Sequence, residues 1–464
     1  MGEFHEGPLI GDDPTGGSIQ VFLTPHNASP RPPRVSHGEG IYMWDTTGKR
    51  YIDVSSGPVA NNLGHANPRV LAAMHAQAEK VAFAFPGIFE SEANEKLADL
   101  LTGLAGPGFE RAFFVSGGSE ATESAIKLSR QYALATNQPE KWKVISREPS
   151  YHGGTLGALA LTGDEVQHQV FGPMLREMPK VPAPFTYRLP PNHDCESYAR
   201  QCAQALDDKI LEEGAETILA FIMEPVGGLA TGALVAEDIY FKMVRDICTR
   251  HRVLLIFDEV MSGAGRTGKF LAADHWPDAK PDIVVLAKGI AAGYTPMGCV
   301  LAPNTIVKAV ADADGFMNGF TYFANPLSCA IGHAVLQEMV DQELVANAAK
   351  RGAQMKTRLL EMAQSNRVMG DVRGRGLLLA VELVSDQETK QQIPLEMQAP
   401  ALFQKIAMEM GLATYCRRTS GGAYGDWLMI TPPLIVTKEQ VDEIATGLEI
   451  ALATFERTIA QAGY

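Results

Sequence analysis

The sequence lacks long apolar runs, an excess of basic residues and paired cysteine motifs. No stretch approaches 18 consecutive apolar residues, so we expect no membrane span and no membrane partner. The formal net charge of -14 argues against a nucleic-acid partner, which would require a basic patch. The six cysteines form no C-x-x-C pair, which favours free thiols and a cytoplasmic protein.

Other signals are missing as well. The N-terminal stretch has no apolar core of the kind found in signal peptides, so none is expected. The 11 histidines are scattered, and neither an H-E-x-x-H motif nor a cysteine cluster occurs, so no metal site is predicted. No internal repeat is visible. What remains is a chain of 464 residues, 46% of them hydrophobic, which suits one large or two to three ordinary domains.

Two apolar runs of five residues stand out, Val253–Phe257 and Ile283–Ala287. Continuous β-branched and aliphatic runs of this length are typical of strands buried on both faces of a parallel sheet. Asp258 follows the first run and Lys288 follows the second. Ligands of open α/β sheets bind beyond the carboxyl ends of the strands, so the sequence predicts a carboxylate and an amine at the mouth of one sheet.

A lysine behind an apolar strand is most often a solvated strand cap, but Asp258 favours a chemical role for Lys288. A desolvated lysine amine forms a Schiff base with a carbonyl compound. A buried carboxylate keeps a pyridine nitrogen protonated, which makes the ring an electron sink. Pyridoxal 5'-phosphate requires both partners, and it also requires a site for its phosphate.

A candidate phosphate site lies at Ser116-Gly117-Gly118-Ser119. The strand expected over Ala112–Val115 runs into this turn, and a helix is expected from Glu120. Backbone N–H groups and the positive end of a helix dipole then face one point, which favours an anion. An ordinary strand-to-helix turn is the alternative. Another acid, Glu224, ends the apolar run Ile218–Met223.

The segment Gly263-Ala-Gly-Arg-Thr-Gly268 matches the dinucleotide pattern G-x-G-x-x-G. That pattern should begin directly after a strand and open a helix, whereas five residues separate it from the strand end at Phe257. A P-loop requires Ser or Thr at Phe270. We therefore expect a mobile loop over the site, with a nucleotide-binding oxidoreductase as a remote alternative.

The remaining segments suggest two domains and an arm. Residues 1–40 are rich in Pro and Gly and are interpreted as an N-terminal arm. Residues 41–75 and 331–464 are assigned to a small domain, and residues 76–330 to a large cofactor-binding domain. Within the large domain, the aromatic stretch Val81–Phe89 is expected to be a core loop, with a pocket wall as the alternative.

Several motifs taken together resemble the class III, or omega-, aminotransferases. They are SGGSEATESAIK, YHGG, MEPV, FDEV, the G-R-T-G loop, LAKG, F-T-Y-x-A-N-P-L and VRGRGLLLAVEL. The resemblance covers about residues 35–460. It implies an α/β protein of the fold-type I pyridoxal-phosphate enzymes, with a mostly parallel central sheet, helices on both faces and a smaller α+β domain built from both termini.

The resemblance also implies roles for individual residues. Lys288 matches the Schiff-base lysine, and Asp258 matches the partner of the pyridine nitrogen. Val260 and Tyr151 are expected to pack on the two faces of the ring, and Glu224 matches an acid beside the cofactor.

Gly118 and Ser119 match the phosphate-binding residues, with Thr321 contributed by a second subunit. The family assembles as homodimers with shared active sites, and the sequence leaves open whether dimers pair into tetramers.

Substrate-binding residues are implied less directly. Arg417 aligns with an arginine that binds a substrate carboxylate in many members and swings away for other substrates. A solvated surface arginine is the alternative, because Arg418 is adjacent and the loop of residues 419–424 resembles an insertion. Phe85 and Tyr151 are further candidates for contact with the substrate.

Two departures from the family bear on the substrate. Many members that use 2-oxoglutarate have Arg after the Y/F-H-G motif, where this chain has Gly154. A second carboxylate would lose its bidentate partner, so pyruvate is the expected acceptor. Many amine–pyruvate members have Trp where Gly57-Pro58-Val59 stands, so the amine itself is left open.

We therefore expect a transamination in which Lys288 moves a proton and an amine or omega-amino acid gives its amino group to a keto acid. A decarboxylating aminotransferase or an aminomutase would use the same cofactor site and remains an alternative. A non-catalytic binding protein is disfavoured by the presence of both Lys288 and Asp258.

Overall fold

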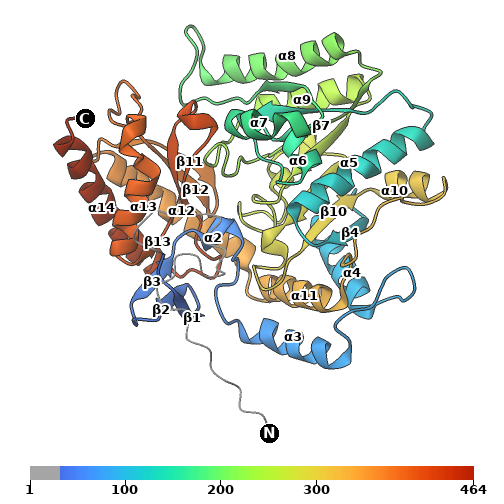
Figure 1. The fold of residues 1–464 in the computed structure, drawn as a ribbon, viewed down its shortest axis with the longest axis horizontal. Coiled ribbons are helices and arrows are strands. Elements are labelled where there is room, and N and C mark those ends of the chain that lie inside the picture. Colours follow the sequence, from blue (N-terminus) through green and yellow to red (C-terminus); the bar gives the residue numbers. More distant parts are fainter. Residues whose placement is uncertain (1–31) are drawn as a thin grey trace.

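The computed structural model describes residues 32–464, so most of the predicted N-terminal arm, residues 1–40, lies outside the described residues. A mixed sheet of seven strands forms the centre of the larger part of the molecule (Figure 1). All strands run parallel except β10, which is antiparallel to both neighbours. The order is β4 (Arg111–Val115), β10 (Gly298–Ala302), β9 (Ile283–Ala287), β8 (Leu254–Asp258), β7 (Ile218–Met223), β5 (Lys143–Glu148) and β6 (Lys180–Pro182).

The two apolar runs are the central strands β8 and β9, as predicted, and they pair in parallel. Every residue of β9 is buried, as is every residue of β8 after Leu254. Burial on both faces explains why the runs are continuously apolar. Alternate side chains enter two cores: Phe257 packs on the side of α9 (Asp238–Arg250), whereas Ile256 packs on the side of α5 (Gly118–Ala135).

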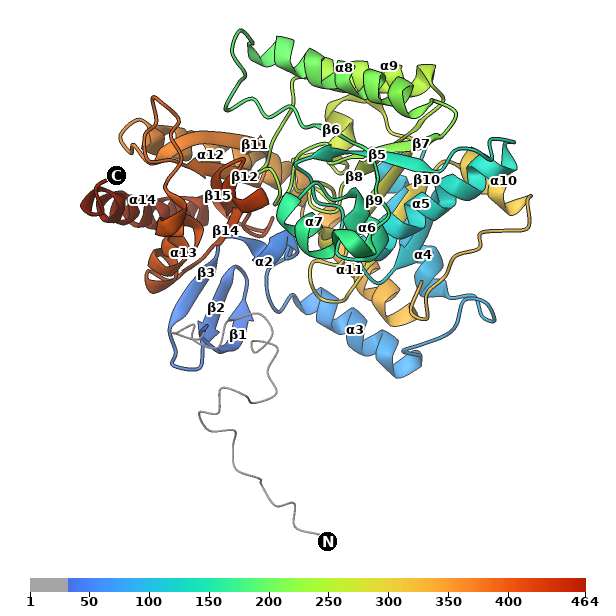
Figure 2. The same cartoon turned by 45° about the horizontal axis from the view of Figure 1, so that its top comes forward.

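Helices therefore cover both faces of the sheet, in agreement with the predicted α/β class (Figure 2). The α3 helix begins after Asn67, whose side chain accepts hydrogen bonds from the backbone N–H groups of Arg69 and Val70. The other helices of this part, besides α5 and α9, are α3 (Pro68–Lys80), α4 (Glu92–Ala105), α6 (Leu156–Leu161), α7 (Glu165–Phe171), α8 (Cys195–Glu213), α10 (Asn304–Ala311) and α11 (Pro326–Asp341), with short 3-10 turns at Gly172–Met174, Ala272–His275, Pro277–Ala279 and Lys288–Ile290.

The smaller part contains two four-stranded sheets built from both ends of the chain (Figure 1). One has the order β1 (Val35–Glu39), β2 (Tyr42–Asp45), β3 (Arg50–Asp53) and β13 (Leu412–Ala413); the other is antiparallel, with the order β11 (Met369–Arg375), β12 (Leu378–Leu383), β15 (Asp426–Ile430) and β14 (Tyr415–Arg418). Its helices are α2 (Ser56–Val59), α12 (Leu344–Ala363), α13 (Ala399–Glu409) and α14 (Lys438–Gln461), with 3-10 turns at Leu395–Met397 and Ser420–Gly422 (η6).

The predicted domain boundaries stay a prediction, and three packing details bear on them. Strand β1 pairs with β2, so residues 35–39 join the small-domain sheet rather than an arm. The α11 helix runs across position 331 and packs against α3 and α4 of the larger part. A capping box at Thr437 opens α14, with Thr437 and Gln440 exchanging side chain-to-backbone hydrogen bonds. No helix within residues 32–464 is long and apolar enough to cross a bilayer.

The glycine-rich segment 263–268 does not form a mobile loop over the site, which corrects the expectation from sequence. Its residues 263–267 are buried, and Arg266 is only 1% exposed. The guanidinium donates to Leu377 O at 3.3 Å, Pro432 O at 2.5 Å and Asn62 Oδ1 at 2.6 Å, which joins the two parts of the molecule. Burial lowers the pKa of Arg266 to about 9. A segment filled by protein in this way has no room for a nucleotide.

Replacing Arg266 by Met should destabilise the fold. The change leaves buried acceptors on Pro432, Leu377 and Asn62 without their donor, which we expect to lower stability by about 3 kcal/mol. With an unfolding entropy of about 2.1 cal/mol/K per residue, the midpoint of thermal unfolding should fall by about 3 °C. Calorimetry measures the midpoint. The exposed neighbour Lys269 serves as the control, and Lys269→Met should leave it unchanged; equal midpoints for the two variants would contradict the assigned role of Arg266.

Candidate functional site

The carboxyl ends of the central strands open on one cavity of about 370 Å³. Asp258 ends β8, Lys288 follows β9 and Glu224 follows β7, and all three line the cavity. Because β7, β8 and β9 are parallel neighbours, their ends meet at the same edge of the sheet. The predicted carboxylate and amine therefore share one site, and its volume is within the range of roughly 300–1,000 Å³ usual for small-molecule sites.

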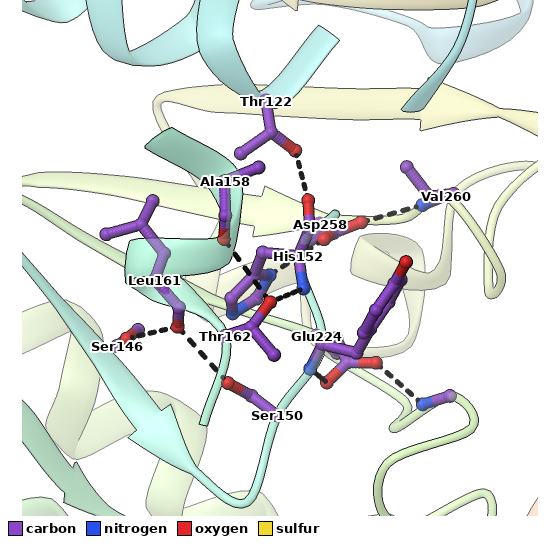
Figure 3. Close-up of polar contacts among 12 residues, drawn as sticks. Thr122, Ser146, Ser150, His152, Ala158, Leu161, Thr162, Glu224, Asp258 and Val260 are labelled. Carbon is purple, nitrogen blue, oxygen red and sulfur yellow. Dashed lines mark hydrogen bonds and ion pairs between the residues drawn. The ribbon is translucent and has the colours of Figure 1, made fainter. Parts of the chain in front are cut away.

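Asp258 is held in place by two hydrogen bonds (Figure 3). Its Oδ2 lies 2.8 Å from Nδ1 of the buried His152, and since a carboxylate only accepts, the imidazole donates. Its Oδ1 accepts from the backbone N–H of Val260 at 3.0 Å. The side chain of Asp258 is 4% exposed. A buried carboxylate fixed on both oxygens is suited to hold a cation at a defined position.

His152 is itself positioned by the hydroxyl groups of two threonines (Figure 3). Its backbone N–H donates to Thr162 Oγ1 at 2.9 Å, and its carbonyl oxygen accepts from Thr122 Oγ1 at 3.0 Å. The second ring nitrogen, Nε2, is buried and has no hydrogen-bond partner among the described residues. These contacts orient the ring toward Asp258.

Lys288 combines an unusual backbone conformation with a shifted pKa. Its φ of 48° lies in the left-handed region, which residues other than glycine adopt only at an energetic cost. Its Nζ donates to Pro58 O at 2.9 Å and faces the cavity. Burial lowers the pKa of Lys288 to about 8, although the charges of Asp258 and Glu224 oppose the shift. Near neutral pH the amine is thus far closer to its nucleophilic form than an ordinary lysine.

Glu224 is a second buried acid at the cavity wall. Its Oε1 accepts from the backbone N–H of Gly228 at 2.8 Å, and its Oε2 accepts from that of Tyr151 at 3.3 Å. Burial raises the pKa of Glu224, and the charge of nearby Asp258 adds to the shift, while His152 acts in the opposite direction. The carboxyl therefore fixes the two segments that carry Tyr151 and Gly228.

The N-terminus of α5 also points at the cavity. Gly117 precedes the helix and offers no side-chain cap, so the first N–H groups of the helix are available to an anion. Ser119 Oγ accepts from the backbone N–H of Gly154 at 3.0 Å. Gly153 has a φ of 138°, and a Cβ there would lie 2.6 Å from Ser119 Oγ. Only glycine allows this close approach beside the helix end.

The two adjacent arginines of β14 have different environments. Arg418 donates to Asp426 Oδ1 at 2.6 Å and to Oδ2 at 2.5 Å, so it is committed to a structural pair. Arg417, which points to the opposite face of the strand, lines the cavity. The sequence did not decide whether Arg417 contacts the substrate or lies on the surface. Because side chains alternate between the two faces of β14, Arg417 reaches the cavity whereas Arg418 does not.

Most of the predicted site residues come together in this cavity, although their functional roles stay predictions. Those that line it are Gly118, Ser119, Tyr151, Glu224, Asp258, Val260, Lys288 and Arg417. Phe85 and Thr321 do not: both are exposed, and Phe85 makes an edge contact with Phe323. The stretch Val81–Phe89 is not a core loop, because Phe83 and Phe89 are 45% and 62% exposed. Local apolarity alone does not reveal whether the chain itself or another surface covers such a stretch.

Sequence reasoning missed three ionisable residues that line the cavity. No role was predicted for His152, although it stands within the YHGG motif, and its contact with an acid 106 positions away leaves no local signal. Asp164 and Tyr415 line the cavity as well. Asp164 has a visible local signal as the N-cap of α7, but this signal indicates only a helix start.

The residues present fit pyridoxal 5'-phosphate, the cofactor expected from the sequence. Lys288 supplies an amine of lowered pKa, Asp258 supplies a fixed buried carboxylate and the uncapped end of α5 supplies an anion site, all on one cavity. The methyl groups of Val260 lie 3.1 and 3.2 Å from the position of a Cβ on Gly118, so the cavity wall is closely packed between them. Within the described residues, no group of three or more His, Cys, Asp or Glu side chains is placed to hold a metal ion.

Comparisons with known proteins point in the same direction. The model of the family described as aminotransferase class-III matches residues 24–452. The aminotransferase YodT of Bacillus subtilis is 36% identical, over 95% of this chain and 99% of its own. The putrescine–pyruvate aminotransferase of Pseudomonas aeruginosa is 29% identical, over 89% and 88%. The crystal structure of an amine transaminase from an uncultivated Pseudomonas species, with bound pyridoxal phosphate, superposes with a TM-score of 0.86 at 34% identity, covering 92% of this chain and 97% of that one.

The lowered pKa of Lys288 predicts the pH dependence of cofactor loading. Only the neutral amine attacks an aldehyde, so the rate at which apoprotein takes up pyridoxal phosphate should rise with pH through about 8 and then level off. An ordinary lysine would continue to gain reactivity until about pH 10. The rate is measured from the absorbance of the bound cofactor after mixing. A steady rise that continues beyond about pH 9 would show that burial does not lower this pKa.

Proposed function

The chain belongs to the class-III aminotransferases, and from the geometry of its site we propose that it transfers the amino group of an amine or omega-amino acid to pyruvate. The protein is a pyridoxal-phosphate-dependent transaminase that acts on amines and keto acids. One observation carries the assignment of its active site: Lys288 and Asp258 follow adjacent parallel strands and face one cavity beside the N-terminus of α5.

Bound pyridoxal phosphate supplies an aldehyde and a protonated pyridine ring that accepts the electron pair left behind when a proton leaves the substrate carbon. With the cofactor bound, the Nζ of Lys288 would hold it and, when displaced by a donor amine, would move the proton from the substrate carbon to the cofactor carbon. The depressed pKa of Lys288, about 8, suits an amine that both accepts and donates a proton near neutral pH.

Asp258 would keep the ring nitrogen of the bound cofactor protonated. Its carboxylate is buried and is held by His152 and by the N–H of Val260, so it presents a fixed negative charge. Val260 and Tyr151 both line the cavity and would pack on the two faces of the ring, and Gly118 and Ser119 with the start of α5 would bind the phosphate. Glu224 holds the Tyr151 segment through its backbone N–H.

The choice of pyruvate rests on the charges of the cavity. Among the described residues that line it, Arg417 is the sole guanidinium, and Gly154 follows the Tyr151-His152-Gly153 segment without adding another. A single guanidinium recognises one carboxylate bidentately, which matches a keto acid with one carboxylate rather than two. The similarity to a putrescine–pyruvate aminotransferase supports the same choice.

A homodimer is proposed from the surface that carries Phe85 and Thr321. The side chains of Phe83, Ile88 and Tyr322 are 45%, 73% and 63% exposed, and Phe83 packs edge-on against Tyr322. Exposed apolar groups gathered in this way favour contact with another surface. In a symmetric dimer this contact would bring Thr321 to the phosphate of the neighbouring site, as the family resemblance implies, and would bring Phe85 close to the same site.

We further propose a cytoplasmic location. The proposal is supported by the six cysteines, which all have free thiols and of which four are buried. Unpaired cysteines are usual in proteins of reducing compartments.

The central test of the proposed reaction separates its two halves. Holoprotein mixed with a donor amine in the absence of any keto acid should lose the absorbance of the aldehyde form of the cofactor, and added pyruvate should restore it. A panel that contains putrescine, 1-phenylethylamine and β-alanine identifies the donor. Chromatography should show alanine and the carbonyl product in equal amounts, without carbon dioxide, which distinguishes this reaction from that of a decarboxylating aminotransferase or an aminomutase.

The matched control is Lys288→Ala, which should fold normally and bind the cofactor without turnover. An unchanged spectrum across the whole amine panel would count against transamination, and full turnover by the variant would refute the role of Lys288.

The proposed dimer predicts a sedimentation mass twice that of one chain. Ile88→Asp places a charge in the proposed interface, so it should yield the mass of a single chain and a protein that loses its cofactor faster on dialysis. Leu211→Asp is the control, because Leu211 is 62% exposed on α8, far along the chain from this surface, and the variant should retain the doubled mass. A single-chain mass for the unchanged protein would refute the dimer.

A further inference from the structure

Arg417 has an acidic neighbour within the cavity that no family motif accounts for. Asp164, which precedes α7, lines the same cavity, and its Oδ2 lies 3.8 Å from Nη2 of Arg417. This separation is within ion-pair range but beyond the range of a hydrogen bond. The two charges attract each other without a directional bond.

Asp164 is rigidly placed. Its side chain is 7% exposed, its Oδ1 accepts from the backbone N–H of Val166 at 3.2 Å, and its Oδ2 accepts from Gln167 Nε2 at 3.0 Å. The helix α7 that it caps packs against η6, the turn that follows Arg417 in the chain. The carboxylate is therefore a fixed feature of the cavity wall.

Arg417, in contrast, retains unused hydrogen-bonding capacity. Its side chain is 37% exposed, and its Nε is buried without a hydrogen-bond partner among residues 32–464. Arg418 beside it is fully engaged with Asp426, so the difference does not arise from the strand as a whole. Arg417 thus has Asp164 as its partner when no substrate carboxylate is bound, and its long side chain can leave this single ionic contact.

We propose that Asp164 is a specificity-determining residue that competes with a substrate carboxylate for Arg417; this inference rests on the proposed function of the site. When the remote part of the substrate is uncharged, Asp164 retains the guanidinium and compensates its charge. When a carboxylate enters, the carboxylate forms the bidentate contact with Arg417 that Asp164 lacks. The pair thereby lets one cavity accept both a neutral amine and a keto acid.

Removing the negative charge of Asp164 should consequently change the affinities for the two substrate types in opposite directions. Without Asp164, Arg417 attracts a carboxylate more strongly, because it has no other ion-pair partner among residues 32–464. An apolar amine binds less well, because it then has to cover an uncompensated guanidinium. A merely structural role for Asp164 would weaken both substrates together.

The test uses Asp164→Asn in the holoprotein, because Asn preserves the N-cap of α7. Two donors are compared in the same half-reaction, namely L-alanine, which has a carboxylate, and 1-phenylethylamine, which has none. The KM for alanine should fall about fivefold, the equivalent of about 1 kcal/mol, and that for 1-phenylethylamine should rise, with kcat little changed. Glu165→Gln removes a charge from the next residue, which is exposed and does not line the cavity, and should change neither KM.

A binding measurement makes the test independent of turnover. Benzoate is an unreactive carboxylate, and calorimetry should show its Kd falling by a similar factor in Asp164→Asn. The double variant with Arg417→Met isolates the pair: in the Arg417→Met background, Asp164→Asn should no longer alter the KM for alanine or the Kd for benzoate.

The inference is overturned if the KM values for both donors shift in the same direction or if neither shifts. It is also overturned if Asp164→Asn still alters the KM for alanine or the Kd for benzoate in the Arg417→Met background. Failure of the proposed function is recognised separately, since in that case the unchanged protein reacts with neither donor, while the benzoate measurements still decide whether Asp164 competes for Arg417.

Discussion

The site depends on the desolvation of an amine and a carboxylate at the ends of two adjacent buried strands. Burial lowers the pKa of Lys288 to about 8, and the same surroundings keep Asp258 away from water and fixed by His152. The apolar strands β8 and β9 cause both effects, because they bring the two residues to one edge and surround them with core. The continuously apolar runs that precede Asp258 and Lys288 therefore account both for the central strands of the fold and for the desolvation of these two side chains.

Two buried guanidinium groups of this region are stabilised by hydrogen bonds rather than by ion pairs. Arg266 is fully buried and donates to Pro432 O, Leu377 O and Asn62, and the buried Arg147 donates to the carbonyl oxygen of Glu224 at 2.6 Å. Backbone and amide acceptors of this kind hold a guanidinium in one orientation without the neutralisation that a carboxylate would bring. The acids beside the cavity thus remain available to the reaction, and the two parts of the molecule stay in register around it.

The part of the cavity wall that carries Arg417 and Asp164 differs from the strand ends. There Arg417 and Asp164 face each other at 3.8 Å, with the arginine partly exposed and the acid held by α7. A fixed acid opposite an adaptable arginine gives the cavity a charge distribution that changes with its occupant, whereas the end with Lys288 and Asp258 stays constant. A transaminase requires this division, because two unlike substrates react in turn at one carbon position.

The sequence by itself determined the central strands and the residues at the strand ends, because each depends on local pattern: continuous apolarity, and an acid or amine directly behind a strand. The sequence also determined the cofactor, because many motifs of one family occur in it in the family's order. Only the tertiary structure decided which of two adjacent arginines reaches the cavity, that the 263–268 segment is buried, and that His152 and Asp164 belong to the site. These outcomes depend on contacts between residues far apart in the chain, and neither charge nor apolarity along the sequence indicates which distant surface a side chain will meet.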